Sequence, residues 1–173
     1  SGQEQADTPL LVAAKENVHG QLQALVKDGS AINDSEADGT TALHWAAYHD
    51  NILAADLLIR AGADVDSAND LGATPLWIAS QNGSDAMVKT LLGGGANPNV
   101  SLLSGETPLM VASRSGAHGV VKQLLTEGAD TAAAATRGQT ALMWAVAERH
   151  ADIVDVLLTH GTDIHRRSDV WRQ

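Results

Sequence analysis

Residues 72–83 read GATPLWIASQNG, and residues 105–116 read GETPLMVASRSG, nearly the same twelve residues repeated 33 positions further along. The same step of 33 residues recurs through most of the 173-residue chain. Two series keep it without a slip, the threonines Thr8, Thr41, Thr74, Thr107 and Thr140 and the glycines Gly29, Gly62, Gly95, Gly128 and Gly161. A fixed period of this length indicates a repeat protein in which each unit stacks on the next.

One unit is expected to form two short helices followed by a hairpin. Thr74-Pro75 is a helix start, because threonine can cap the first turn and proline suits the first helical position. Gly83 suits the left-handed residue that ends this helix, and Ser84 is expected to cap a second helix over residues 85–92. Neither helix is long enough to be stable alone, so each must bury its apolar face against the next unit. The sequence therefore predicts an all-α repeat solenoid of helix–turn–helix units with projecting β-hairpin loops and no extended sheet.

These features resemble the ankyrin repeat, which has the same Gly-x-Thr-Pro-Leu motif, small residue pair, Leu-Leu in the second helix and closing Gly-Ala-Asp. The resemblance is best over residues 39–66, 72–99 and 105–130. It implies a single domain over residues 1–173, with repeats at about 5–33, 36–66, 69–99, 102–132 and 135–165 and the start of a sixth at 166–173. The phrases TALHWAAYHD and TALMWAVAERH are also similar to ankyrin arrays of environmental bacteria. Some of these arrays are exported, so a bacterial source is expected and an exported protein is slightly favoured over a cytoplasmic one.

The chain departs from the family at one position in four of its five units. The family histidine that ties adjacent hairpins by hydrogen bonds is present only as His44, and the matching residues are Leu11, Trp77, Met110 and Met143. The resemblance implies this tie at His44, and the same ties are in question in the other four units.

The acidic residues are concentrated in the first half of the chain. Residues 1–86 carry 13 acidic and three basic side chains, whereas residues 87–173 carry eight of each, so the first half holds the whole net charge of -10. Such a field repels nucleic acids and anionic membranes, and a basic segment of another protein is its natural complement. No apolar run approaches the roughly 18 residues that a membrane span needs. Cysteine is absent, which excludes disulfides and thiol chemistry. A monomer is expected.

No pattern in the sequence favours catalysis, a metal or a cofactor. His44 and His49 are five residues apart on a helix, so they do not face one ion. Asp64 and Asp66 correspond to uncharged residues in other units, which favours hairpin capping over acid–base chemistry. Residues 93–95, three glycines, lack the lysine and serine or threonine of a phosphate loop. A protein that is not an enzyme is expected.

The family binds proteins through a concave surface of hairpin tips and first helices, and residues that vary between units usually supply the contacts. The candidate partner-binding residues are Asp38, Thr40, Tyr48, His49, Leu71, Trp77, Gln81, Leu103, Arg114, Arg137 and Glu148. Trp77 is also explained by filling space between units, which is the favoured interpretation. Trp45 and Trp144 stand where other units have valine or isoleucine and are expected in the core.

Two functions remain open. The first is a protein–protein interaction scaffold that binds a partner in its concave groove. The alternative is a non-catalytic targeting or stabilising module of a larger protein, for which export is the favoured location, because the chain enters a sixth hairpin after His165 and stops without a polar cap.

Overall fold

The computed structural model describes residues 7–29 and 31–161, and within them it contains ten α-helices and no strand. The helices come in five pairs of seven- to nine-residue helices. The first helices of the pairs are α1 (Pro9–Lys15), α3 (Ala42–Tyr48), α5 (Pro75–Asn82), α7 (Pro108–Ser115) and α9 (Ala141–Ala147). The second helices are α2 (His19–Lys27), α4 (Ile52–Arg60), α6 (Asp85–Gly93), α8 (His118–Thr126) and α10 (Ala151–Thr159). The predicted all-α solenoid is confirmed, whereas the sixth unit at 166–173 lies outside the described residues.

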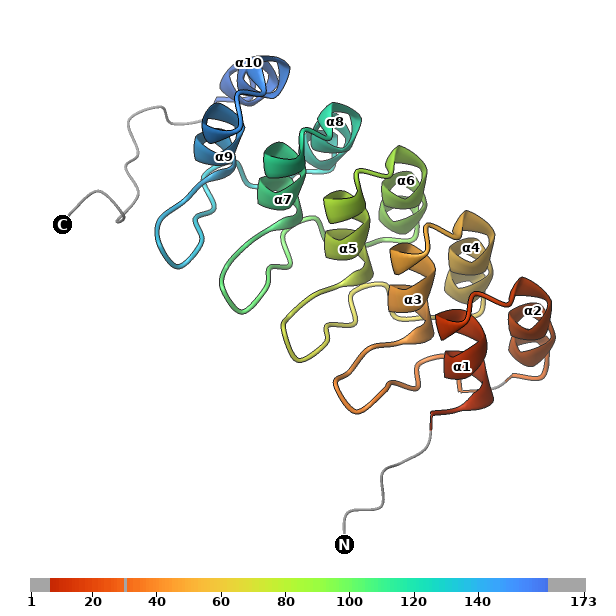
Figure 1. Ribbon diagram of the computed structural model, residues 1–173. Coiled ribbons are helices and arrows are strands. Elements are labelled where there is room, and N and C mark those ends of the chain that lie inside the picture. Colours follow the sequence, from red (N-terminus) through yellow and green to blue (C-terminus); the bar gives the residue numbers. More distant parts are fainter. Residues whose placement is uncertain (1–6, 30, 162–173) are drawn as a thin grey trace, which may run out of the picture.

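The pairs stack side by side into an elongated molecule with two layers of helices (Figure 1). The first helices pack on one another in one layer, from α1 through α9, and the second helices form the layer behind them. All the hairpins project to the same side of the stack, away from the second helices. We call the surface made by the hairpins and the first helices the hairpin face.

The first helices begin at the threonines of the 33-residue series. The side chains of Thr41, Thr74, Thr107 and Thr140 each accept a hydrogen bond from the backbone N–H three residues later, which confirms the predicted cap. Thr8 stands at the same place but makes no such bond. Gly83 has a φ of 70° and ends α5, and Ser84 caps α6, both as predicted.

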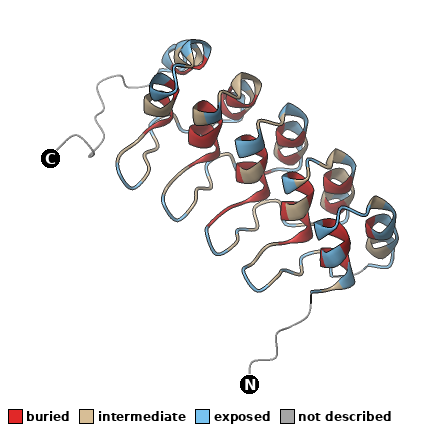
Figure 2. Ribbon diagram, viewed as in Figure 1, coloured by how far each residue is buried: buried red, intermediate tan, exposed pale blue. Residues whose placement is uncertain are grey.

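The core is a series of thin layers built from leucine and alanine. Leu58, Leu91, Leu124 and Leu157 occupy one position of the second helices and are all fully buried. The alanines Ala13, Ala46, Ala79, Ala112 and Ala145 are at most 3% exposed, and their small side chains let neighbouring first helices approach closely. Figure 2 shows the buried residues where the helices face one another. Each fully buried leucine contributes about 1.5–3 kcal/mol, so stability comes from the contacts between units.

The tryptophans do not all lie where the sequence suggested. Trp77 is only 9% exposed and packs with Ala73 and Val111, so it fills space between two units. Trp45 and Trp144 pack against the core but remain half-buried, and the expectation of two core residues was therefore wrong in part. At the same position Val12 is 37% exposed, whereas Val111, which packs with Trp77, is 1% exposed. The burial of a side chain here therefore depends on its neighbours.

Neighbouring hairpins are joined by backbone hydrogen bonds. Asp70 N–H donates to Asp38 O over 2.8 Å, and the same bond recurs one unit later from Leu103 to Leu71 and two units later from Thr136 to Ser104. His44 adds the expected tie, with Nε2 2.8 Å from Ala73 O. The hairpins that lack the histidine therefore keep a link that depends on no side chain.

The turn glycines allow this close approach. Gly72 has a φ of +82°, and a Cβ at this position would lie 2.8 Å from the backbone nitrogen of Leu103. A side chain here would therefore meet both backbone strain and the next hairpin.

Candidate partner-binding site

Four of the five candidate residues at hairpin tips are exposed, and the fifth, Thr40, is half-buried. Asp38 and Arg137 lie on the second and fifth units, and Leu71 and Leu103 lie between them on adjacent tips that share a backbone hydrogen bond. The two leucines are 69% and 81% exposed. They place an apolar patch at the edge of the hairpin face, where exposed leucines are typical of contact surfaces.

The candidates at the ends of the first helices differ in their surroundings. Tyr48 is 61% exposed, and Gln81 and Glu148 are exposed too. His49 and Arg114 are half-buried, because each makes contacts within the protein. Trp77 is buried, so it offers almost no surface to a partner and its assignment as a contact residue needs correction.

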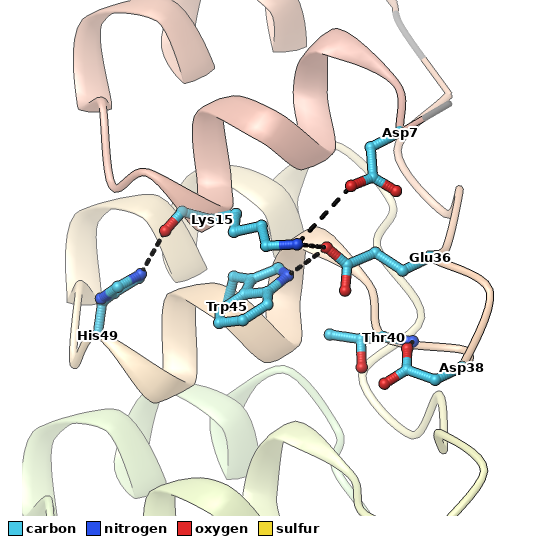
Figure 3. Close-up of polar contacts among 7 residues, drawn as sticks. All are labelled: Asp7, Lys15, Glu36, Asp38, Thr40, Trp45 and His49. Atoms are coloured by element: carbon cyan, nitrogen blue, oxygen red, sulfur yellow. Dashed lines mark hydrogen bonds and ion pairs between the residues drawn. The ribbon is translucent and has the colours of Figure 1, made fainter. Parts of the chain in front are cut away.

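Lys15 is the centre of a cluster that joins the first two units (Figure 3). Its Nζ lies 2.9 Å from Glu36 Oε1 and 3.8 Å from Asp7 Oδ2. The same nitrogen lies 5.5 Å from the centre of the Trp45 ring, whose Nε1 donates to the same Glu36 oxygen over 3.3 Å. The hydrogen bond to Glu36 raises the pKa of Lys15, so the ammonium group stays charged. We call this the Lys15 cluster.

Three aromatic rings continue the Lys15 cluster along α3. Tyr48 meets Trp45 edge-on, with ring centres 5.5 Å apart and planes at 84°. His49 stacks on Trp45 at 6.0 Å, and its Nε2 lies 2.8 Å from the carbonyl oxygen of Lys15 at the end of α1. Contacts with the preceding unit therefore fix Trp45 and His49, and Tyr48, which packs on both of them, is the most exposed of the three.

Asp38 and Thr40 form the turn beside these rings. The Thr40 N–H donates to Asp38 Oδ1 over 2.9 Å. This hydrogen bond lowers the pKa of Asp38 below its ordinary value, so the carboxylate is charged at neutral pH. Thr40 thus positions the acidic side chain.

His44 lies beneath this turn and is uncharged at neutral pH, because burial lowers the pKa of its ring below the ordinary value of 6.5. Its Nδ1 accepts from Thr41 N–H over 3.1 Å. Nε2 therefore carries the proton and donates to Ala73 O.

An open pocket of about 290 Å³ lies between α3 and α5 at this place. It contains two carboxylates, three aromatic rings and an aliphatic side chain from the next unit. Its lining residues are Glu36, Asp38, Thr40, His44, Trp45, Tyr48 and Ile78. We call it the Tyr48 pocket. It is acidic and aromatic, and no lysine or arginine lines it.

A second cluster of the same kind lies three units further along. Arg114 forms an ion pair with Glu106, and its guanidinium carbon lies 5.0 Å from the centre of the Trp144 ring. The spacing repeats that of Asp7, Lys15 and Trp45, eight residues from acid to base and thirty from base to indole. Sequence reasoning missed Lys15, Trp45 and Trp144 as surface residues, although this shared spacing was a signal that could have found them.

The described residues include no group of three histidine, aspartate or glutamate side chains placed to hold a metal ion. Asp64 and Asp66 serve the hairpins: Asp64 Oδ1 accepts from Asp66 N–H, and Asp66 Oδ1 accepts from Asn97 N–H in the next unit. Over the same described part of the chain, no helix is both long and apolar enough to span a membrane.

Known proteins share this repeat. The family model of ankyrin repeats, three copies long, matches residues 2–69 and 76–168. The palmitoyltransferase AKR1 of Yarrowia lipolytica is 37% identical over 57 residues, which are 32% of this chain and 8% of that protein. The transient receptor potential cation channel subfamily V member 6 of Rattus norvegicus is 46% identical over 57 residues, 31% of this chain and 7% of the channel. The matches thus cover less than a tenth of the length of these curated relatives.

Proposed function

Because the chain belongs to the ankyrin-repeat family, whose repeats are generally protein–protein interaction modules, we propose that it binds a partner protein through its hairpin face. The contact is centred on the second and third units, and the partner presents a basic segment there. The family is typically non-catalytic. We propose that this protein is a monomeric scaffold that has no cofactor and that binds neither nucleic acid nor membranes.

The observation that carries this proposal is the exposed ring of Tyr48 beside an acidic pocket. An aromatic side chain with a polar end is a frequent anchor in protein interfaces. The ring is 61% exposed although α1 and α3 hold its neighbours in place, so binding would order few side chains. Glu36 and Asp38 next to it match a basic partner, and the acidic first half of the chain would speed the approach of such a partner.

The partner contact is tested by photo-crosslinking followed by mutagenesis. A benzophenone side chain at Gln81, on the hairpin face, is expected to capture the partner, whereas the same group at Lys122, exposed on α8, is not. Against the captured partner, Tyr48→Ala should weaken binding by about 1–3 kcal/mol, and Lys122→Ala should change it by less than about 0.5 kcal/mol. Crosslinks and losses of affinity confined to the second helices would overturn the proposal.

A second function is favoured by the lengths of the relatives. Both similar proteins are more than ten times longer than the segment they share with this chain, so ankyrin repeats there form one part of a larger protein. We propose as the alternative that this chain is a targeting or stabilising module of a larger bacterial protein that is exported. An antibody raised against the chain tests this, because a native band well above 18.0 kDa supports the module and a band at that mass contradicts it.

A further inference from the structure

Two basic side chains of the hairpin face are each held by an indole ring together with carboxylates. Lys15 sits over the Trp45 ring and pairs with Glu36 and Asp7, and Arg114 sits over the Trp144 ring and pairs with Glu106. Both cations come from the last turn of a first helix, and both indoles come from the next unit. Attraction between a cation and an aromatic face adds to the ion pair in such sites. At two places on this surface, a basic side chain is thus held jointly by an indole ring and a carboxylate.

The Tyr48 pocket offers a second ring and a second carboxylate, Tyr48 and Asp38, beside Trp45 and Glu36, which already hold Lys15. Tyr48 occupies in α3 the position that Lys15 has in α1 and Arg114 has in α7, so no basic residue reaches this gap from the preceding helix. The Asp38 carboxylate is held by Thr40 N–H, and Tyr48 and Trp45 stand edge-on to one another at the wall of the pocket. Ile78 supplies an aliphatic surface for the methylene groups of a long side chain.

We propose that the Tyr48 pocket takes one arginine side chain of the partner protein, with the guanidinium group against Tyr48 and Asp38. A planar guanidinium can stack on a ring and donate to a carboxylate at the same time, which an ammonium group does less well. The pocket of about 290 Å³ has room for such a side chain. This inference rests on the proposed function, because it names the residue that anchors the partner.

The inference is tested by nuclear magnetic resonance on the whole chain with two short probes. One is the blocked pentapeptide Gly-Ser-Arg-Ser-Gly, and the other has citrulline, which is neutral and of nearly the same shape, in place of arginine. The readout is the indole N–H signal of Trp45, which donates to Glu36 at the pocket and is assigned by its loss in Trp45→Phe. The arginine peptide should shift this signal to saturation, and the citrulline peptide should bind several-fold to about tenfold more weakly.

Matched variants locate the effect. Asp38→Asn and Tyr48→Ala should each weaken arginine-peptide binding several-fold, whereas Gln23→Ala, at an exposed position of the second helix α2, should leave it unchanged. Unchanged signals from α7 to α10 would show that the variants are folded. Equal binding of the two peptides, an unmoved Trp45 signal, or equal binding by Asp38→Asn and the parent would each overturn the arginine site.

The peptide experiment and the crosslinking experiment can fail independently, so each tests its own proposal. A partner that crosslinks to the hairpin face while the peptides fail overturns the arginine pocket alone. A partner that crosslinks only to the second helices overturns the proposed function, whatever the peptides do.

Discussion

His44 is a single residue on which the contact between two hairpins depends. Its ring accepts from Thr41 N–H on one side and donates to Ala73 O on the other. The bond from Thr41 N–H requires the neutral ring with the proton on Nε2, because a protonated Nδ1 cannot accept. A second proton would have to displace the Thr41 N–H and would place a charge in a site with 1% exposure.

The stability of the protein should therefore depend on pH through His44. Burial lowers the pKa of His44 in the folded chain below 6.5, so the unfolded chain binds the proton more readily. The stability that neutral His44 contributes is fully present above pH 6.5 and is lost as the pH falls from there toward the folded-state pKa. His44→Met, which copies Met110 and Met143, should cost about 1–3 kcal/mol near pH 7.5 and flatten the dependence of stability on pH below pH 6.5. Urea unfolding of both proteins at several pH values checks this, and parallel curves would contradict it.

At the scale of an element, the glycines after the second helices set where each helix ends. Gly62 follows α4 with a φ of +93°, and no heavy atom lies within 4 Å of an added Cβ. Gly62→Ala should therefore cost about 1–2 kcal/mol through the backbone alone. Gly93 is the matched control, since an added Cβ there would also meet no heavy atom within 4 Å and its φ is not in the left-handed region. Gly93→Ala, at a helical position, should stabilise by about 0.5–1 kcal/mol. Denaturant unfolding measures both, and changes of the same sign would remove the capping argument.

The helices and their caps were predictable because they depend on local residues that recur with the period. Thr74, Gly83 and Ser84 act within a few residues of themselves, so their roles could be assigned without a structure. The burial of Trp45 and Trp77 was harder to predict, because the period places a residue in the unit but does not show how much space its neighbours leave for the side chain. Ala73 leaves room for the indole of Trp77, whereas Trp45 stands at an edge and reaches the surface.

The candidate site was predictable only in outline, for a similar reason. The exposed tips and Tyr48 follow from variation between units, but the Lys15 cluster requires knowing which helix end faces which indole thirty residues later. The links between hairpins that lack histidine could not be foreseen from side chains, since backbone groups make them.

At the scale of the whole molecule, the terminal pairs should open before the central ones. The pair α9 and α10 packs on α7 and α8 alone among the described helices, whereas α5 and α6 have neighbours on both sides. Val146 on α9 is 58% exposed, although Ala47 and Ser80 at the same position are fully buried by the next unit. Hydrogen exchange should therefore show residues beyond about 150 exchanging before those of α5 and α6. Equal protection along the stack would contradict this expectation.

The bonds that join one hairpin to the next also determine how the protein responds to tension. Asp70 N–H to Asp38 O, Leu103 N–H to Leu71 O and Thr136 N–H to Ser104 O each link one pair of adjacent units. A force that pulls the two ends apart meets these links in succession, because each unit packs on its neighbours. Every unit that detaches releases 33 residues, or about 115 Å of extended chain. Under load the molecule would lengthen in equal steps, one for each unit that unfolds, while the remaining units stay folded.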